Sequence, residues 1–234
     1  RLSGIFRDVY LYSKDKVEIR DYFVKTDLDE NYENATLTLD ADIRSLDKNV
    51  SGKYTVKADL YEMDSDKKVW DSPLSFDVKA GKATVEESAD DKGQRGSGSK
   101  EVVNPKKWFA DTPNLYRLLI QLVDEDGKVI ETTCQRVGFR EIDKVDINEE
   151  GQEQAQINGK KIMFRHETDN VDGRALTKED IRTDLMTMKQ FNVNAIRTSH
   201  YPNHPYTYAL ADELGLMMCD EANIESHKGS FENG

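Results

Sequence analysis

The spacing of apolar residues changes once along the chain, near residue 143, and this change constrains the fold more than any other feature. Before it, apolar and polar residues alternate in short segments separated by turn signals. Alternation with a period of two indicates β-strands with one buried face, and seven such segments are typical of an immunoglobulin-like β-sandwich. The segments are Val17–Arg20, Thr36–Ile43, Tyr54–Tyr61, Val69–Val78, Val102–Val103, Leu115–Val123 and Val129–Phe139.

The stretch from Ala80 to Lys100 interrupts the alternation. It is rich in Gly, Ser, Asp and Lys, and we interpret it as a long solvent-exposed loop between two strands. A phosphate site at Gly93–Ser99 is disfavoured, because no helix pattern begins immediately afterwards to supply the backbone amides that such a site uses.

After residue 143, strand patterns alternate with helix patterns. Such units form a parallel sheet, open or closed into a barrel, with functional groups gathered at the carboxyl ends of the strands. A turn signal at Ile157–Lys160 introduces the series, and Thr177 with Asp180 forms a capping-box helix start. The predicted elements are a strand at Lys161–Phe164, a helix from Thr177 to Phe191, a strand at Asn194–Arg197, a helix from His204 to Leu214 and a strand at Leu216–Cys219.

Charge and hydropathy exclude two classes of partner. The chain has 45 acidic and 33 basic residues, a net charge of −12, and no block of basic residues, so we expect no nucleic-acid partner. The longest apolar run, Leu214–Cys219, is far shorter than the roughly 20 residues that span a bilayer. We therefore expect no membrane span either.

The cysteines and the first residues indicate the compartment and the extent of the chain. Cys134 and Cys219 lie in apolar strand patterns, where we expect unpaired, reduced thiols that pack as small hydrophobes, and hence a cytoplasmic protein. The sequence begins at Arg1 with neither a Met nor a signal-peptide pattern. We interpret it as an internal piece of a longer polypeptide.

The four histidines all lie beyond residue 164. His166, His200 and the pair Glu225 and His227 each follow a predicted barrel strand, so these side chains are predicted to share one edge of the sheet. Solvated loop histidines would account for any one of these positions. They account poorly for three successive strand ends.

Two pairs have spacings that can be read as metal sites. His200 and His204 are separated as zinc ligands on a helix would be, but Pro202 and Pro205 prevent the shared helical face that this requires. Glu225 and His227 alternate on an extended stretch and suit Mg²⁺, or Mn²⁺, with further ligands from elsewhere. An ordinary salt-linked loop is the alternative.

Several segments carry a family resemblance. Residues 194–202, NAIRTSHYP, followed by Asp212, Gly215 and an apolar run, resemble the signature of glycoside hydrolase family 2. Residues 220–227, DEANIESH, resemble the next block of the large bacterial β-galactosidases in that family. Residues 1–9, 113–116 and 137–141 resemble the end of the family's jelly-roll domain and the end of its first immunoglobulin-like domain.

The resemblance implies a domain order and roles for individual residues. Residues 1–14 would end the jelly-roll sugar-binding domain, 15–141 would form the sandwich and 142–234 would begin a (β/α)8 TIM barrel. Glu225 and His227 would bind the active-site magnesium. His166 and His200 would contact the galactosyl group and its transition state. Arg197 would support the nucleophilic carboxylate by a charge-assisted hydrogen bond.

The implied activity is retaining hydrolysis of terminal β-D-galactosides such as lactose, by a homo-oligomeric parent. Retention requires two carboxylates, which in this family come from later barrel strands, so we expect residues 1–234 alone to be inactive. A non-catalytic carbohydrate-binding or interaction sandwich is the alternative. The sequence departs from the family at Met163–Glu167, where relatives have a longer run with a glycine, and at Thr207, where a bulky apolar residue is usual.

Overall fold

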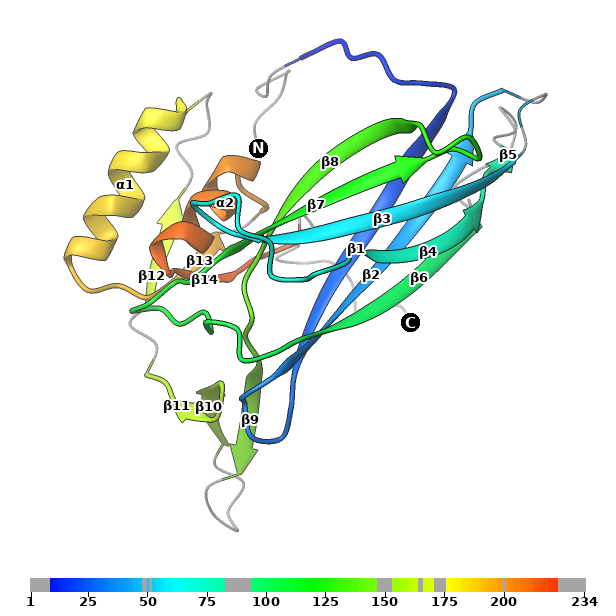
Figure 1. Cartoon of the computed structure of the whole chain (residues 1–234). Coiled ribbons are helices and arrows are strands. Elements are labelled where there is room, and N and C mark those ends of the chain that lie inside the picture. The colour runs from blue at the N-terminus through cyan, green and yellow to red at the C-terminus, as the bar shows by residue number, and fades with distance from the viewer. Residues whose placement is uncertain are drawn as a thin grey trace, which may run out of the picture. The chain divides into compact units, whose positions relative to one another are not determined.

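The computed structural model divides the chain into two compact units, which we describe separately (Figure 1). The sandwich unit comprises the described parts of Leu11–Trp108 and Asn114–Lys160. The barrel unit comprises Phe109–Pro113 and the described part of Lys161–Gly234, together with the first residues of the chain. The described residues are 9–47, 50, 52–82, 94–146, 153–163, 166–170, 176–199 and 201–222.

Two sheets form the sandwich (Figure 1). In the first, β2 (Ala35–Ser45) pairs antiparallel with β1 (Val17–Leu28) and β6 (Gln94–Val102), and parallel with the short β5 (Gly81–Lys82). The second sheet has the order β4-β3-β7-β8 and is antiparallel throughout. Its strands are β4 (Leu74–Lys79), β3 (Lys53–Glu62), β7 (Tyr116–Val123) and β8 (Val129–Val137).

The core of the sandwich follows from the alternation in the sequence. In β2 and β7, every second side chain is buried, which includes Leu37 and Leu39 on one sheet and Leu118 and Ile120 on the other. Phe139, just after β8, is fully buried and meets the ring of Tyr116 edge-on at 5.2 Å between ring centroids. One apolar cluster therefore connects the inner faces of both sheets.

Strand β6 corrects the loop interpretation of Ala80–Lys100, because residues 94–100 belong to it and pair with β2. Its glycines have a packing role. A Cβ atom at Gly96 or Gly98 would come within 2.8 Å or 2.6 Å of the Phe76 ring. Glycines stand at the inward positions of β6 because the Phe76 ring occupies the space that side chains would need. The alternation of apolar and polar residues that marks a strand is therefore missing from this part of the sequence.

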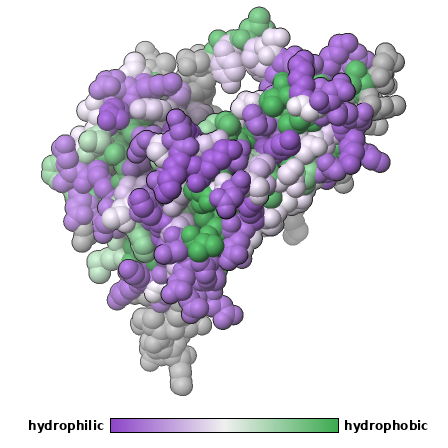
Figure 2. All heavy atoms as spheres, viewed as in Figure 1, coloured by the Kyte–Doolittle hydropathy of each residue, from purple (hydrophilic) through white to green (hydrophobic). Residues whose placement is uncertain are grey.

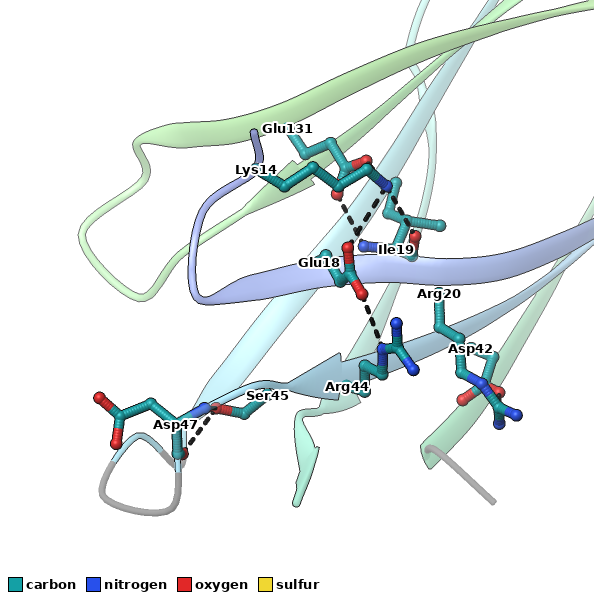
Figure 3. Close-up of polar contacts among 9 residues, drawn as sticks. All are labelled: Lys14, Glu18, Ile19, Arg20, Asp42, Arg44, Ser45, Asp47 and Glu131. Carbon is teal, nitrogen blue, oxygen red and sulfur yellow. Dashed lines mark hydrogen bonds and ion pairs between the residues drawn. The ribbon is translucent and has the colours of Figure 1, made fainter. Parts of the chain in front are cut away.

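Charged side chains connect β1 with β8 (Figure 3). Glu131 accepts a hydrogen bond from the backbone N–H of Ile19 at 2.7 Å and pairs with Lys14 at 2.8 Å. Burial opposes the charge on Lys14, but the hydrogen bond and negative charge of Glu131 outweigh it, so the pKa of Lys14 is raised. Glu18 is buried and pairs with Arg44 at 2.7 Å. These charges are matched within the sandwich and stabilise its edge.

A small antiparallel sheet follows the sandwich strands and consists of β9 (Ile142–Asp146), β10 (Glu153–Ile157) and β11 (Lys160–Lys161). Asn158 and Gly159 form the predicted turn, both with positive φ. Contacts group most of this sheet with the sandwich. The domain bounds inferred from the sequence stay a prediction.

The barrel unit contains the predicted alternation of strands and helices. Strands β12 (His166–Asn170), β13 (Ala195–Ser199) and β14 (Met217–Cys219) form a parallel sheet in that order. Helix α1 (Lys178–Gln190) begins at the Thr177–Asp180 capping box, and α2 (Pro205–Leu214) ends at Gly215 in the left-handed conformation. The predicted order, a β-sandwich followed by strands and helices that alternate around a parallel sheet, is therefore confirmed.

The segment Phe109–Pro113 lies between β6 and β7 in the sequence but belongs to the barrel unit. Lys189 donates hydrogen bonds to the carbonyl oxygens of Ala110 at 2.7 Å and Gly215 at 3.4 Å. Burial lowers the pKa of Lys189, and the charge of Asp111 counteracts this effect. The segment is therefore attached to the ends of both helices, since α1 carries Lys189 and Gly215 caps α2.

The surface agrees with the charged composition, since hydrophilic residues cover most of the face shown in Figure 2. In the part of the chain that the structure describes, no helix is long and apolar enough to cross a membrane. Cys134 and Cys219 are unpaired, as predicted, but both are exposed, so the prediction that they pack as small hydrophobes is wrong. Cys134 lies on the outward face of β8 and Cys219 is the last residue of β14.

Candidate functional site

An arginine and a glutamate pair at the carboxyl edge of the parallel sheet. Arg197 is the middle residue of β13 and the last one paired with β14, and Glu221 follows the end of β14 by two residues. The Nε atom of Arg197 donates to Oε1 of Glu221 at 2.5 Å, and the two side chains retain 39% and 26% of their exposed surface. The pair is therefore held by the fold and is still accessible to a ligand.

A second set of hydrogen bonds lies beside this pair. Thr198 is fully buried, and its hydroxyl donates to Oδ1 of Asp220 at 3.0 Å and accepts from the backbone N–H of Glu221 at 2.9 Å. The hydroxyl of Tyr208 donates to the same Asp220 oxygen at 2.6 Å and accepts from the backbone N–H of Asn203 at 2.7 Å. These contacts join the ends of β13 and β14 with helix α2.

The arrangement suits recognition of a polar ligand. A guanidinium group donates charge-assisted hydrogen bonds to carboxylates, and carboxylates accept them from hydroxyl groups. The pair of Arg197 and Glu221 therefore offers both kinds of contact at the edge of a parallel sheet where barrel enzymes build their sites. The cation of this pair, Arg197, is also one of the site residues predicted from the sequence.

The structure places only part of the predicted site. Arg197 is the middle residue of β13, and its role in supporting a nucleophile stays a prediction. His200, Glu225 and His227 lie outside the described residues. Their roles stay predictions, as does the convergence of the histidines on one edge.

The predicted position of His166 is wrong. It was expected to follow a strand, but it is the first residue of β12 and pairs with Ala195, the first residue of β13. The backbone of His166 therefore lies at the amino end of the sheet. The apolar run suggested a strand at Lys161–Phe164. The strand that pairs with β13 comes later, at His166–Asn170.

His204 has a structural use at the start of α2. Its Nδ1 atom accepts the backbone N–H of Tyr206 at 3.0 Å and so caps the helix. This agrees with the argument against a zinc pair at His200 and His204. Within the described ranges, no group of three or more His, Cys, Asp or Glu side chains could hold a metal ion.

Sequence reasoning did not identify Thr198, Tyr208, Asp220 or Glu221 as site residues. A signal was present for two of them, because Asp220 and Glu221 are adjacent acids directly after a predicted strand, where functional groups of parallel sheets gather. No signal was available for Thr198 and Tyr208. Their contacts depend on the register of β13 against β14, which pairs Arg197 with Cys219.

Comparison with protein families gives two adjacent matches. The family model "Glycosyl hydrolases family 2" matches residues 17–140, and "Glycosyl hydrolases family 2, TIM barrel domain" matches residues 145–234. A β-galactosidase of Priestia megaterium is 40% identical over 97% of this chain, and one of Pseudoalteromonas haloplanktis is 38% identical over all of it. The chain spans about a fifth (21%) of the length of these relatives.

Solved structures share the fold of the chain. A β-glycosidase from Bacteroides vulgatus matches 94% of the chain with a TM-score of 0.71 and 26% identity, and the match covers 26% of that structure. A β-glucuronidase from Bacteroides uniformis matches 87% with a TM-score of 0.69 and 25% identity, over 23% of its own length. One of these names specifies a glucuronide and the other specifies no sugar, so the structural likeness alone does not select a substrate.

Proposed function

The chain belongs to family 2 of the glycosyl hydrolases, and from this premise we propose that it forms part of a retaining glycosidase that removes terminal β-D-galactosyl groups from substrates such as lactose. The observation that carries the choice of sugar is the identity of about 40% over nearly the whole chain with a protein named β-galactosidase. The cytoplasm is the proposed compartment and a homo-oligomer the proposed assembly of the complete protein.

The position of Arg197 supports the reaction class. A retaining mechanism uses one carboxylate as nucleophile and a second as acid and base. A half-exposed guanidinium at the carboxyl edge of the sheet can hold the nucleophile ionised through a charge-assisted hydrogen bond. In this proposal Glu221 orients Arg197 from one side, and the nucleophile, from a later barrel strand, approaches from another.

The remaining roles are proposed for His200, Glu225 and His227, which lie outside the described residues. His200 would hydrogen-bond hydroxyl groups of the galactosyl unit, where an oxocarbenium-like transition state strengthens such bonds. The sugar contact predicted for His166 is not carried over, because its backbone lies at the opposite end of the sheet. Glu225 and His227 would hold Mg²⁺, or Mn²⁺. A divalent cation there would tune the proton-donating carboxyl group.

Turnover of two chromogenic substrates by the complete protein tests the proposal. We expect nitrophenyl β-D-galactoside to be hydrolysed with a kcat/KM about 100-fold or more above that of nitrophenyl β-D-glucuronide. Residues 1–234 expressed alone serve as the inactive control, since both catalytic carboxylates are proposed to lie in later barrel strands. A preference for the glucuronide would contradict the choice of sugar, and an inactive complete protein would favour the alternative of a non-catalytic carbohydrate-binding sandwich.

The metal sites need a separate measurement. We expect Glu225→Gln to weaken Mg²⁺ binding in calorimetric titration of the complete protein by about tenfold or more, and to reduce turnover. Glu179→Gln, the same change on the exposed side of α1, is the matched control. Wild-type turnover by Glu225→Gln without any response to magnesium or chelator would remove the metal role.

A further inference from the structure

The buried hydroxyl of Thr198 extends the contact between β13 and β14 beyond the paired part of the sheet. Backbone pairing of the two strands ends at Arg197 and Cys219. One residue later, the Thr198 hydroxyl donates to Asp220 and accepts from the N–H of Glu221, at 3.0 Å and 2.9 Å. A single side chain therefore holds together the two strand ends from which the next loops begin.

The phenol of Tyr208 completes the arrangement from α2. It donates to the same Oδ1 atom of Asp220 at 2.6 Å and accepts the N–H of Asn203 at 2.7 Å. Each hydroxyl has one proton to donate, and both protons go to one carboxylate oxygen. Asp220 thus connects the end of β13 with α2, although it belongs to neither.

The loop between β13 and α2 is anchored at both of its ends by this network. Thr198 and the buried Ser199 fix the side at which the loop leaves β13, and Tyr208 binds the backbone of the buried Asn203 just before α2. Arg197 and Glu221 lie at the same edge and are joined to each other, so any displacement of the strand ends would move them too.

We infer that Thr198, Tyr208 and Asp220 are positioning residues that fix the sugar-binding edge of the sheet, and with it Arg197, Glu221 and the backbone of Asn203. The effect on hydrolysis rests on the proposed function; the network of hydrogen bonds does not. Displacement of a reacting group by about 1 Å can reduce a rate about 100-fold, so an edge held by side chains that touch no substrate can still govern turnover.

Single substitutions that remove one oxygen test this inference in the complete protein. We expect Tyr208→Phe and Thr198→Val to lower kcat for nitrophenyl β-D-galactoside by about tenfold or more, with a smaller change in KM, because the edge is fixed for the transition state. Thr198→Ser keeps the hydroxyl and should restore most of the activity. Tyr206→Phe makes the same change on the same helix, outside the network, and is the control.

Hydrogen–deuterium exchange supplies a readout that does not depend on activity. Peptides covering residues 199–203 and 220–222 should exchange faster in Tyr208→Phe and Thr198→Val, while peptides of α1 keep their wild-type rates. Wild-type kcat and exchange in both variants would overturn the inference, and so would an equal loss in Tyr206→Phe. If the wild-type protein hydrolyses no galactoside, the proposed function fails, and faster exchange at the two loops alone still supports the network.

Discussion

The sandwich and the start of the barrel differ in how completely each buries its own apolar residues. Among the described residues, the sandwich has 22 buried side chains in one cluster, drawn from both sheets. The cluster of the barrel unit has six, from the two helices, β13 and Leu216 just before β14. The candidate site lies in the unit with the smaller core. In the described residues, the large apolar core and the candidate site therefore lie in different units.

The two regions can be followed separately in one sample. Both tryptophans, Trp70 and Trp108, belong to the sandwich unit, so tryptophan fluorescence reports its unfolding. Both helices of the described chain belong to the barrel unit, so circular dichroism at a helix-sensitive wavelength reports the other. Both signals can be recorded on the 234-residue chain.

The largest effect is expected from a cavity in the sandwich. Phe139→Ala removes a fully buried ring that packs against Tyr116, and this should lower the free energy of unfolding in the fluorescence transition by about 3–5 kcal/mol. Phe23→Ala is the matched control, because Phe23 is 61% exposed and should cost at most about 0.5 kcal/mol. Equal losses for the two variants would show that the sandwich core is not closed as described.

An intermediate effect is expected where the barrel unit contacts the segment Phe109–Pro113. Gly215 has a φ of +72°, and a Cβ atom there would lie 2.1 Å from the carbonyl oxygen of Ala110. Gly215→Ala should therefore lower the free energy of unfolding of the barrel unit, followed by circular dichroism, by about 2–4 kcal/mol. The causes are left-handed backbone strain and the displacement of Ala110.

Gly127→Ala separates these two causes. Gly127 has a similar φ of +82° but nothing within 4 Å of a Cβ atom, so its substitution should cost only about 1 kcal/mol, in the fluorescence transition. The difference between the two glycines measures the close approach to Ala110. A Gly215→Ala protein no less stable than Gly127→Ala would mean that the segment is not held against the end of α2.

The sequence predicted what depends on periodicity and local chemistry, and failed where a contact with a distant segment decides the structure. Helix α1 begins directly after its predicted cap, Thr177, and α2 ends directly before its predicted stop, Gly215. Strand β6 was missed because its glycines are explained by side chains of β4, above all Phe76, which are distant in the sequence. The position of His166 and the contacts of Thr198 depend on strand register, which periodicity does not specify.

The smallest effect is expected at the capping box of α1, where a local interaction acts without the core. Thr177→Ala removes the hydroxyl that accepts a hydrogen bond from the N–H of Asp180 at 3.2 Å. It should lower the free energy of unfolding measured by circular dichroism by about 1 kcal/mol. Asp180 accepts hydrogen bonds from the hydroxyl and N–H of Thr177, which lower its pKa below 3.8. The pKa of Asp180 is lower in the folded chain than in the unfolded chain. The stabilisation by its carboxylate is therefore present above the unfolded pKa and disappears as the pH falls through the folded pKa.

Asp180→Asn should therefore differ most from the wild type at neutral pH, and the difference should shrink as the pH falls below about 4. Urea unfolding followed by circular dichroism between neutral pH and about pH 3 measures it, with the fluorescence transition of the sandwich as the internal reference, since that region contains neither Thr177 nor Asp180. A difference that stays constant across this range would mean that the Asp180 carboxylate does not stabilise α1 by its charge. In that case the hydroxyl of Thr177 alone caps the helix, and the barrel unit relies still more on its small core.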